Sequence, residues 1–99
     1  MPHVPPQDHA EILREVGELK NKVATLGDAT YEGRDHACFD KADATLEQCY
    51  SAINETTDQS RIVEELQNAY HALARWMNGP AAPAVVPARE QLQRLWGRL

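Results

Sequence analysis

The sequence predicts an all-α protein, and three observations support that prediction. Hydrophobic residues recur with alternating spacings of three and four in three successive stretches of the 99-residue chain. Residues typical of helix ends separate these stretches, and no run alternates hydrophobic and polar residues as a β-strand would. Short connections make neighbouring helices antiparallel. We therefore expect an up-down-up three-helix bundle, followed by a short C-terminal helix beyond a Pro-rich linker.

The first helix is expected over about residues 8–26. Asp8 has the residue type of an N-cap, and Glu11 stands where a capping box requires it. Gly27 suits the position just beyond a helix C-terminus. The hydrophobic residues of this stretch fall on one narrow stripe, which consists of Ile12, Val16, Leu19, Val23 and Leu26.

Two further helices are expected over about residues 35–55 and 59–78. The stripe of the second consists of Phe39, Ala42, Leu46, Cys49 and Ile53. The third has Asp58 as its candidate N-cap and ends at an Asn-Gly-Pro sequence, which is a strong stop signal. Its stripe consists of Ile62, Leu66, Ala69, Leu73 and Trp76, flanked by Val63, Tyr70 and Met77. This wide hydrophobic face predicts a central helix or one that helps to form an interface.

The C-terminal segment is expected to form a short amphipathic helix. Its hydrophobic residues share one side and are Leu92, Leu95, Trp96 and Leu99. A helix this short is not stable alone in water, so either the same chain or another protein must cover that side. These boundaries divide the chain into a flexible lead (1–7), a three-helix bundle (8–78), a Pro/Ala linker (79–87) and the C-terminal helix (88–99).

The charge of the chain is unevenly distributed. The net charge is −5; three arginines against one glutamate give residues 88–99 a charge of +2, which leaves −7 for the rest. The basic segment could fold back on its own acidic body or reach another acidic surface. An acidic body disfavours nucleic-acid binding, because phosphate binding needs a basic face. An acidic mimic of nucleic acid stays open as an alternative.

The cysteines and the hydropathy pattern indicate a cytoplasmic protein. Cys38 and Cys49 lie eleven residues apart. On one helix this spacing separates them by about 16 Å, too far for a disulfide. We expect reduced, partly buried thiols, with a disulfide between two copies as the alternative. We find neither a signal-peptide pattern nor a long apolar segment.

Four polar residues on the second expected helix are the best candidates for metal binding: His36, Asp40, Asp43 and Glu47. Their spacing places nitrogen and oxygen ligands on one face of a helix. No other helix offers the matching set that di-metal bundles use. We therefore expect a solvated acidic face, and keep a metal- or ligand-binding bundle as the alternative. His9 continues the first hydrophobic stripe; it would make assembly pH-sensitive if buried, and would be unimportant in a frayed first turn.

These features predict a binding protein rather than an enzyme, because no catalytic or cofactor motif is found. We expect a non-enzymatic adaptor, regulator or stoichiometric inhibitor of a larger protein that uses no cofactor and forms a homodimer. Tryptophan and tyrosine are enriched in the residues that dominate binding energy at interfaces. The expected interface residues are Leu92, Leu95, Trp96, Leu99, Trp76, Tyr70 and Met77.

Overall fold

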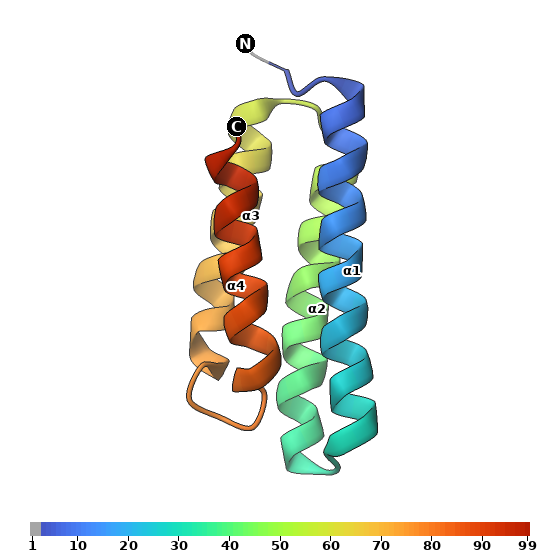
Figure 1. The fold of residues 1–99 in the computed structure, drawn as a ribbon, viewed down its shortest axis with the longest axis vertical. Coiled ribbons are helices and arrows are strands. Elements are labelled where there is room, and N and C mark those ends of the chain that lie inside the picture. The colour runs from blue at the N-terminus through green and yellow to red at the C-terminus, as the bar shows by residue number, and fades with distance from the viewer. Residues whose placement is uncertain (1–2) are drawn as a thin grey trace.

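The computed structural model describes residues 3–99 and shows four α-helices side by side (Figure 1). The elements are α1 (Pro6–Thr30), α2 (Arg34–Asn54), α3 (Gln59–Leu73), the short 3-10 helix η1 (Ala74–Trp76) and α4 (Ala82–Gly97). Successive helices run in opposite directions, so the chain forms an α1–α2 hairpin and an α3–α4 hairpin. The all-α prediction is confirmed, but the C-terminal helix is a full member of the bundle. None of the helices in residues 3–99 is long and apolar enough to cross a lipid bilayer.

The N-terminal segment lies against the α2–α3 connection instead of forming a free lead. Val4 is buried, and its N–H donates to the carbonyl of Thr57 at 2.8 Å. The Nδ1 atom of His3 lies 3.1 Å from the Thr57 hydroxyl. Residues 1–2 of the predicted lead lie outside the described residues.

Helix α1 is longer at both ends than the sequence suggests. It begins at Pro6, so Asp8 lies in the first turn and makes no capping hydrogen bond. A proline is favoured there because the first N–H groups of a helix have no intrahelical partner. The helix also continues past Gly27, where a Cβ atom would lie only 2.6 Å from the Cβ of Phe39. Glycine at this position therefore serves the close approach of α1 and α2, not a helix end.

Helices α2 and α3 begin within one residue of the expected positions. Gly33 precedes α2 with φ 65°, in the left-handed region that glycine adopts readily. Asp58 caps α3, because its Oδ1 accepts a hydrogen bond from the Ser60 N–H at 3.0 Å. The predicted N-cap is confirmed. The third predicted helix ends earlier, at Leu73, and its last turn tightens into η1.

The Pro-rich segment departs most from the sequence prediction. Residues 79–87 were expected to be a linker, but α4 begins at Ala82. Pro83 stands in the first turn, where its missing N–H needs no acceptor. Pro87 lies inside the helix and removes one hydrogen bond. Burial of the hydrophobic face of this turn offsets that loss, because Val85 and Ala88 are enclosed in the core.

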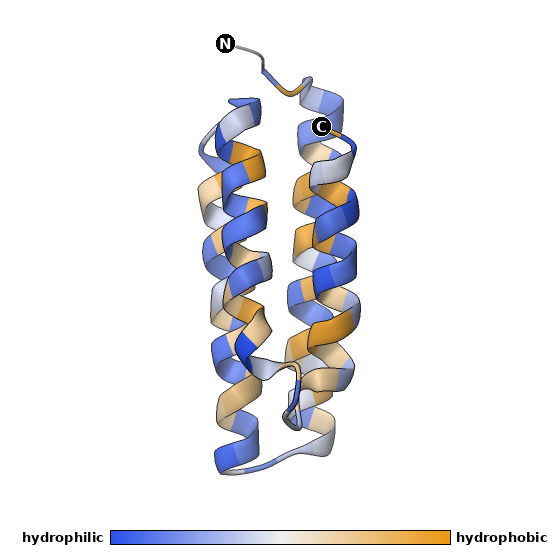
Figure 2. Cartoon of the chain, turned by 90° about the vertical axis from the view of Figure 1, so that its left-hand side faces the viewer, coloured by the Kyte–Doolittle hydropathy of each residue, from blue (hydrophilic) through white to orange (hydrophobic). Residues whose placement is uncertain are grey.

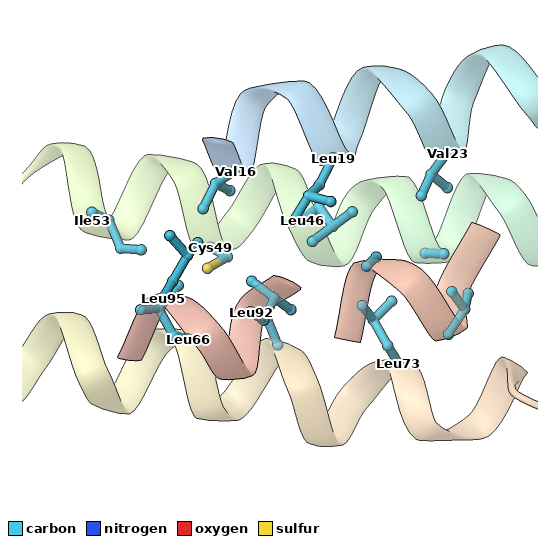
Figure 3. Packing of buried hydrophobic residues seen from close by; sticks show 14 of the residues in the cluster. Val16, Leu19, Val23, Leu46, Cys49, Ile53, Leu66, Leu73, Leu92 and Leu95 are labelled. Carbon is cyan, nitrogen blue, oxygen red and sulfur yellow. The ribbon is translucent and has the colours of Figure 1, made fainter. Parts of the chain in front are cut away.

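All four helices contribute to one hydrophobic core (Figure 3). The five positions predicted on α2 are all buried; elsewhere, Leu26 and Trp76 are only half-buried. Leu92 and Leu95 of α4 are each 0% exposed. Burial of one leucine side chain contributes about 1.5–3 kcal/mol. The hydrophobic side of the C-terminal helix is thus covered by its own chain.

The basic C-terminal segment folds back on acidic α1. Arg98 Nη2 donates to Glu15 Oε2 at 2.6 Å, and its Nη1 lies 3.5 Å from Glu11 Oε1. Gln91 Nε2 donates to the other oxygen of Glu15 at 2.6 Å. These contacts join α4 to α1 near the chain termini.

Candidate protein-interaction face

The structure brings three of the seven predicted interface residues together on one face. The other four lie apart from that face. Leu92 and Leu95 lie inside the core and offer no exposed surface. Trp76 is half-buried on the α2 side, where Lys41 Nζ lies 5.9 Å from the centre of its ring. Leu99 is half-buried at the opposite end of the bundle, where its carbonyl accepts a hydrogen bond from Gln59.

The other three, Tyr70, Met77 and Trp96, come together on the outer side of the α3–α4 hairpin. The rings of Tyr70 and Trp96 meet edge to face with centroids 5.1 Å apart. Arg89 joins them: its guanidinium carbon lies 3.9 Å from the Tyr70 ring centroid. Its Nε donates to the Tyr70 carbonyl at 2.9 Å, and its Nη1 contacts the sulfur of Met77. Backbone and side-chain contacts therefore hold this cluster in one arrangement.

This cluster belongs to two rows that follow the core stripes of α3 and α4 by one residue. Each row keeps spacings of four and three. The rows consist of Val63, Gln67, Tyr70, Ala74 and Met77, which run from α3 through η1, and of Ala82, Val86, Arg89, Gln93 and Trp96 on α4. We call these ten residues the aromatic seam. Figure 2 views the molecule from this side. Gln67, Ala74 and Gln93 are exposed, and the other members are half-buried.

The chemistry of the aromatic seam suits contact with another protein. Tryptophan, tyrosine, methionine and arginine are enriched at protein interfaces, whereas acidic residues are depleted there. The seam contains all four types and no acidic residue, although the chain has a net charge of −5. Arg89 is its only charged member, and sequence reasoning missed it. Its position seven residues before Trp96, on the same side of α4, was the available signal.

The proposed metal ligands lie along the α1–α2 hairpin and do not converge. His36 Nε2 bonds to Asp28 Oδ1 at 2.8 Å, while Nδ1 bonds to Asp40 Oδ2 at 3.2 Å. The two carboxylates therefore bind opposite edges of one imidazole ring. Glu47 is exposed. Within residues 3–99, no three histidine, cysteine or acidic side chains are placed to hold a metal ion.

The same side of the molecule shows two shifted pKa values. The hydrogen bond that the His36 ring donates to the Asp28 carboxylate raises the pKa of His36, and Asp40 adds to the effect. Burial raises the pKa of the half-buried Asp43 carboxyl, although nearby Lys20 acts in the opposite direction. Its Oδ1 is enclosed without a hydrogen-bond partner among the described residues. We call the charged side chains on this side of the α1–α2 hairpin the charged seam. They are Lys20, Asp28, His36, Asp40, Asp43 and Glu47.

A groove of about 510 Å³ runs between α1 and α4. It stays open because Ala84 and Pro87 on its α4 wall are short side chains. Its rim carries both signs of charge, including Lys22 and Glu90. None of the four residues of the ligand-binding alternative, which are His36, Asp40, Asp43 and Glu47, lines this groove.

The two cysteines and His9 take part in packing and in contacts between helices. Both cysteines are free; Cys49 is buried, and desolvation raises its pKa to about 12. Cys38 is half-buried, so it is the more accessible thiol. His9 Nε2 donates to the carbonyl of Ile53 at 2.8 Å and thereby ties α1 to the C-terminal end of α2.

We compared the chain with known proteins in three ways. Neither protein-family models, nor curated proteins, nor solved structures yield a significant match. The aromatic seam is therefore assessed by its own geometry and chemistry.

Proposed function

We propose that this protein is a non-enzymatic interaction module, which acts as an adaptor, regulator or stoichiometric inhibitor by binding a protein partner through the aromatic seam. One observation carries the proposal. Tyr70, Arg89 and Trp96 are held together by ring and hydrogen-bond contacts on the outer side of α3–α4. The free thiols Cys38 and Cys49 support a cytoplasmic setting for this function.

The rigidity of the seam supports a binding role. Its two rows stand on helices whose inner faces are fully packed, because Leu66 and Leu73 of α3 and Leu92 of α4 are each 0% exposed. Binding costs less free energy when the contact residues are already ordered. Aromatic side chains on such a scaffold supply large contact areas with few torsions to restrict.

The electrostatics also favour this face. The chain carries a net negative charge, which repels an acidic partner. The aromatic seam itself contains no carboxylate, so this repulsion is weakest there. The Arg89 guanidinium is already engaged by the Tyr70 ring and carbonyl. Its Nε–H is therefore satisfied within the chain, and a partner that covers the seam must supply acceptors for the N–H groups that face it.

The test places negative charge on the seam without disturbing the core. Gln67 and Gln93 are exposed, so Gln67→Glu/Gln93→Glu should fold normally. Gln7 and Gln48 are also exposed and lie on α1 and α2, so Gln7→Glu/Gln48→Glu makes the same chemical change away from the seam. Each full-length variant is immobilised and exposed to extract from its own cells, and captured proteins are quantified.

We expect the wild type and the Gln7/Gln48 variant to capture the same partner. The Gln67/Gln93 variant should bind this partner at least about tenfold more weakly, which corresponds to about 1.4 kcal/mol of binding free energy. Equal capture by all three proteins would contradict the proposal, and so would a wild type that neither captures a protein nor associates with its own copies.

A further inference from the structure

We infer that the partner bound by the aromatic seam is a second copy of this chain, related by a two-fold axis that places one seam against the other. This inference rests on the function proposed above. It names the partner from three properties of the seam: its charge, its polar groups and its residue spacing.

Charge limits where two copies can meet. Each chain carries a net charge of −5, so two copies repel each other overall. A two-fold contact through the charged seam would bring Asp40, Asp43 and Glu47 against their own copies. The aromatic seam has no acidic residue, and its single cation, Arg89, already lies over the Tyr70 ring. Two copies therefore meet through this seam with the least repulsion.

The exposed polar groups of the seam are self-complementary. A two-fold contact presents the same groups to each other, so each must be able to pair with its own kind. The amide side chains of Gln67 and Gln93 contain both donors and an acceptor, and can bond to the same amide of another copy. Arg89 already donates its Nε–H to the Tyr70 carbonyl at 2.9 Å, so one of its five N–H groups is satisfied within the chain.

The spacing of the two rows repeats the pattern that lets helices interlock. Alternating steps of four and three place side chains in a narrow seam for knobs-into-holes packing. Rows with the same spacing on α3 and α4 can receive the rows of an identical hairpin at a shallow crossing angle. Small members such as Ala74 and Ala82 leave room beside large ones such as Trp96.

The size of the seam sets the expected strength. Ten residues on each copy are fewer than the about 20–30 of a standard stable interface. We therefore expect a reversible monomer–dimer equilibrium with a dissociation constant on the order of 10–100 μM. Such a dimer forms at high local concentration and dissociates on dilution.

The experiment measures molecular mass by sedimentation equilibrium, for the full chain over concentrations that bracket this range. Wild type and Gln7→Glu/Gln48→Glu should shift from monomer to dimer as concentration rises. Gln67→Glu/Gln93→Glu should stay monomeric, because four carboxylates would face one another. Gln67→Lys/Gln93→Lys should also stay monomeric when it is measured by itself, because four lysines would face one another.

Mixing provides the decisive control. Equal amounts of the Gln67/Gln93 glutamate and lysine variants should form a heterodimer, because opposite charges then face each other across the two-fold axis. A merely misfolded variant would not be rescued in this way. A wild type that stays monomeric throughout, a dimer that persists in the glutamate variant, or a mixture that does not associate would overturn the inference. If the wild type is monomeric but cell extracts still yield a seam-dependent partner, the proposed function survives and only the identity of the partner is wrong.

Discussion

The two hairpins use the same helix positions for opposite chemistry. In each hairpin, a second set of residues follows the core stripe by one position. In α1–α2 these positions hold Leu13 and Tyr50 beside the charged Lys20, Asp40, Asp43 and Glu47; in α3–α4 they include Val63, Tyr70, Val86, Arg89 and Trp96 and no acidic residue. The charged seam is held by hydrogen bonds such as His36 to Asp28 at 2.8 Å. The aromatic seam is held by ring contacts and by Arg89.

This difference indicates how a small bundle can combine solubility with association. Exposed ion pairs contribute little stability, since water and salt compete for their partners, but their charges keep copies apart. Aromatic contacts stabilise the α3–α4 hairpin and leave a surface without carboxylates. The predictions below test whether the two seams differ in this way, beginning with the core on which both depend.

The largest effect is expected from loss of α4. A chain that ends at Asn78 exposes the core residues Leu66 and Leu73, which α4 helps to cover. We expect it to show no cooperative thermal unfolding. The milder Leu92→Ala should lower the free energy of unfolding by about 2–5 kcal/mol, measured by urea denaturation. A truncated chain as stable as the full one would show that α4 is not part of the core.

The close approach of α1 and α2 is tested by a matched pair of glycine variants. A Cβ at Gly27 would lie 2.6 Å from the Cβ of Phe39, so Gly27→Ala should destabilise by about 1–3 kcal/mol. A Cβ at Gly17 would lie 3.6 Å from the Tyr50 ring, an ordinary contact. Gly17→Ala should therefore be neutral or stabilise by up to about 1 kcal/mol. Equal urea midpoints for the two variants would contradict the helix spacing described here.

The aromatic pair should show a measurable coupling energy. A double-mutant cycle with Tyr70→Leu and Trp96→Leu should give about 0.5–1.5 kcal/mol, because edge-to-face rings attract beyond their burial. The same cycle on the exposed pair Arg14–Glu18 of α1 should give about 0.3–0.5 kcal/mol. Both are measured by denaturation at low concentration, where the monomer dominates. Reversal of this order would remove the energetic contrast between the aromatic seam and surface ion pairs.

The smallest effect concerns His36 and pH. Its pKa is raised in the folded chain, so its stabilising contribution is complete below the unfolded value of about 6.5 and is lost as pH rises through the folded pKa. Asp28→Asn should move the pKa of His36 down toward its ordinary value. An NMR titration of the imidazole protons tests this. An unchanged pKa in Asp28→Asn would show that this hydrogen bond is not the cause.

The hydrophobic periodicity and the residues at helix ends correctly predicted the buried face of α2 and the N-cap of α3. The stripe from Phe39 to Ile53 is buried as predicted, and Asp58 caps α3. The start of α4 was missed because proline ends most helices, yet Pro83 stands in a first turn and burial offsets Pro87. These outcomes depend on which surfaces meet, and a single helix pattern does not contain that information.

The candidate interaction face was predicted only in part, because a single helix pattern does not show which residues of two helices meet. Tyr70, Met77 and Trp96 were identified by residue type and spacing, but their meeting depends on the register between α3 and α4. Arg89 was missed because its role is a contact across that register. The predicted metal stripe shares one face of α2, but of its four residues only His36 and Asp40 form a contact, and Asp28 of α1 takes the other edge of the His36 ring.

The central claim is that this protein associates through the aromatic seam and not through the charged seam. The most direct measurement is a dilution series of two-dimensional ¹H–¹⁵N spectra of the full chain, from about 1 mM to about 10 μM, across the expected dissociation constant. We predict concentration-dependent shifts at seam residues of α3 and α4, including the Trp96 indole, and constant shifts at Asp40, Asp43 and Glu47. Shifts confined to the α1–α2 hairpin, or spectra that do not change with concentration, would contradict the account.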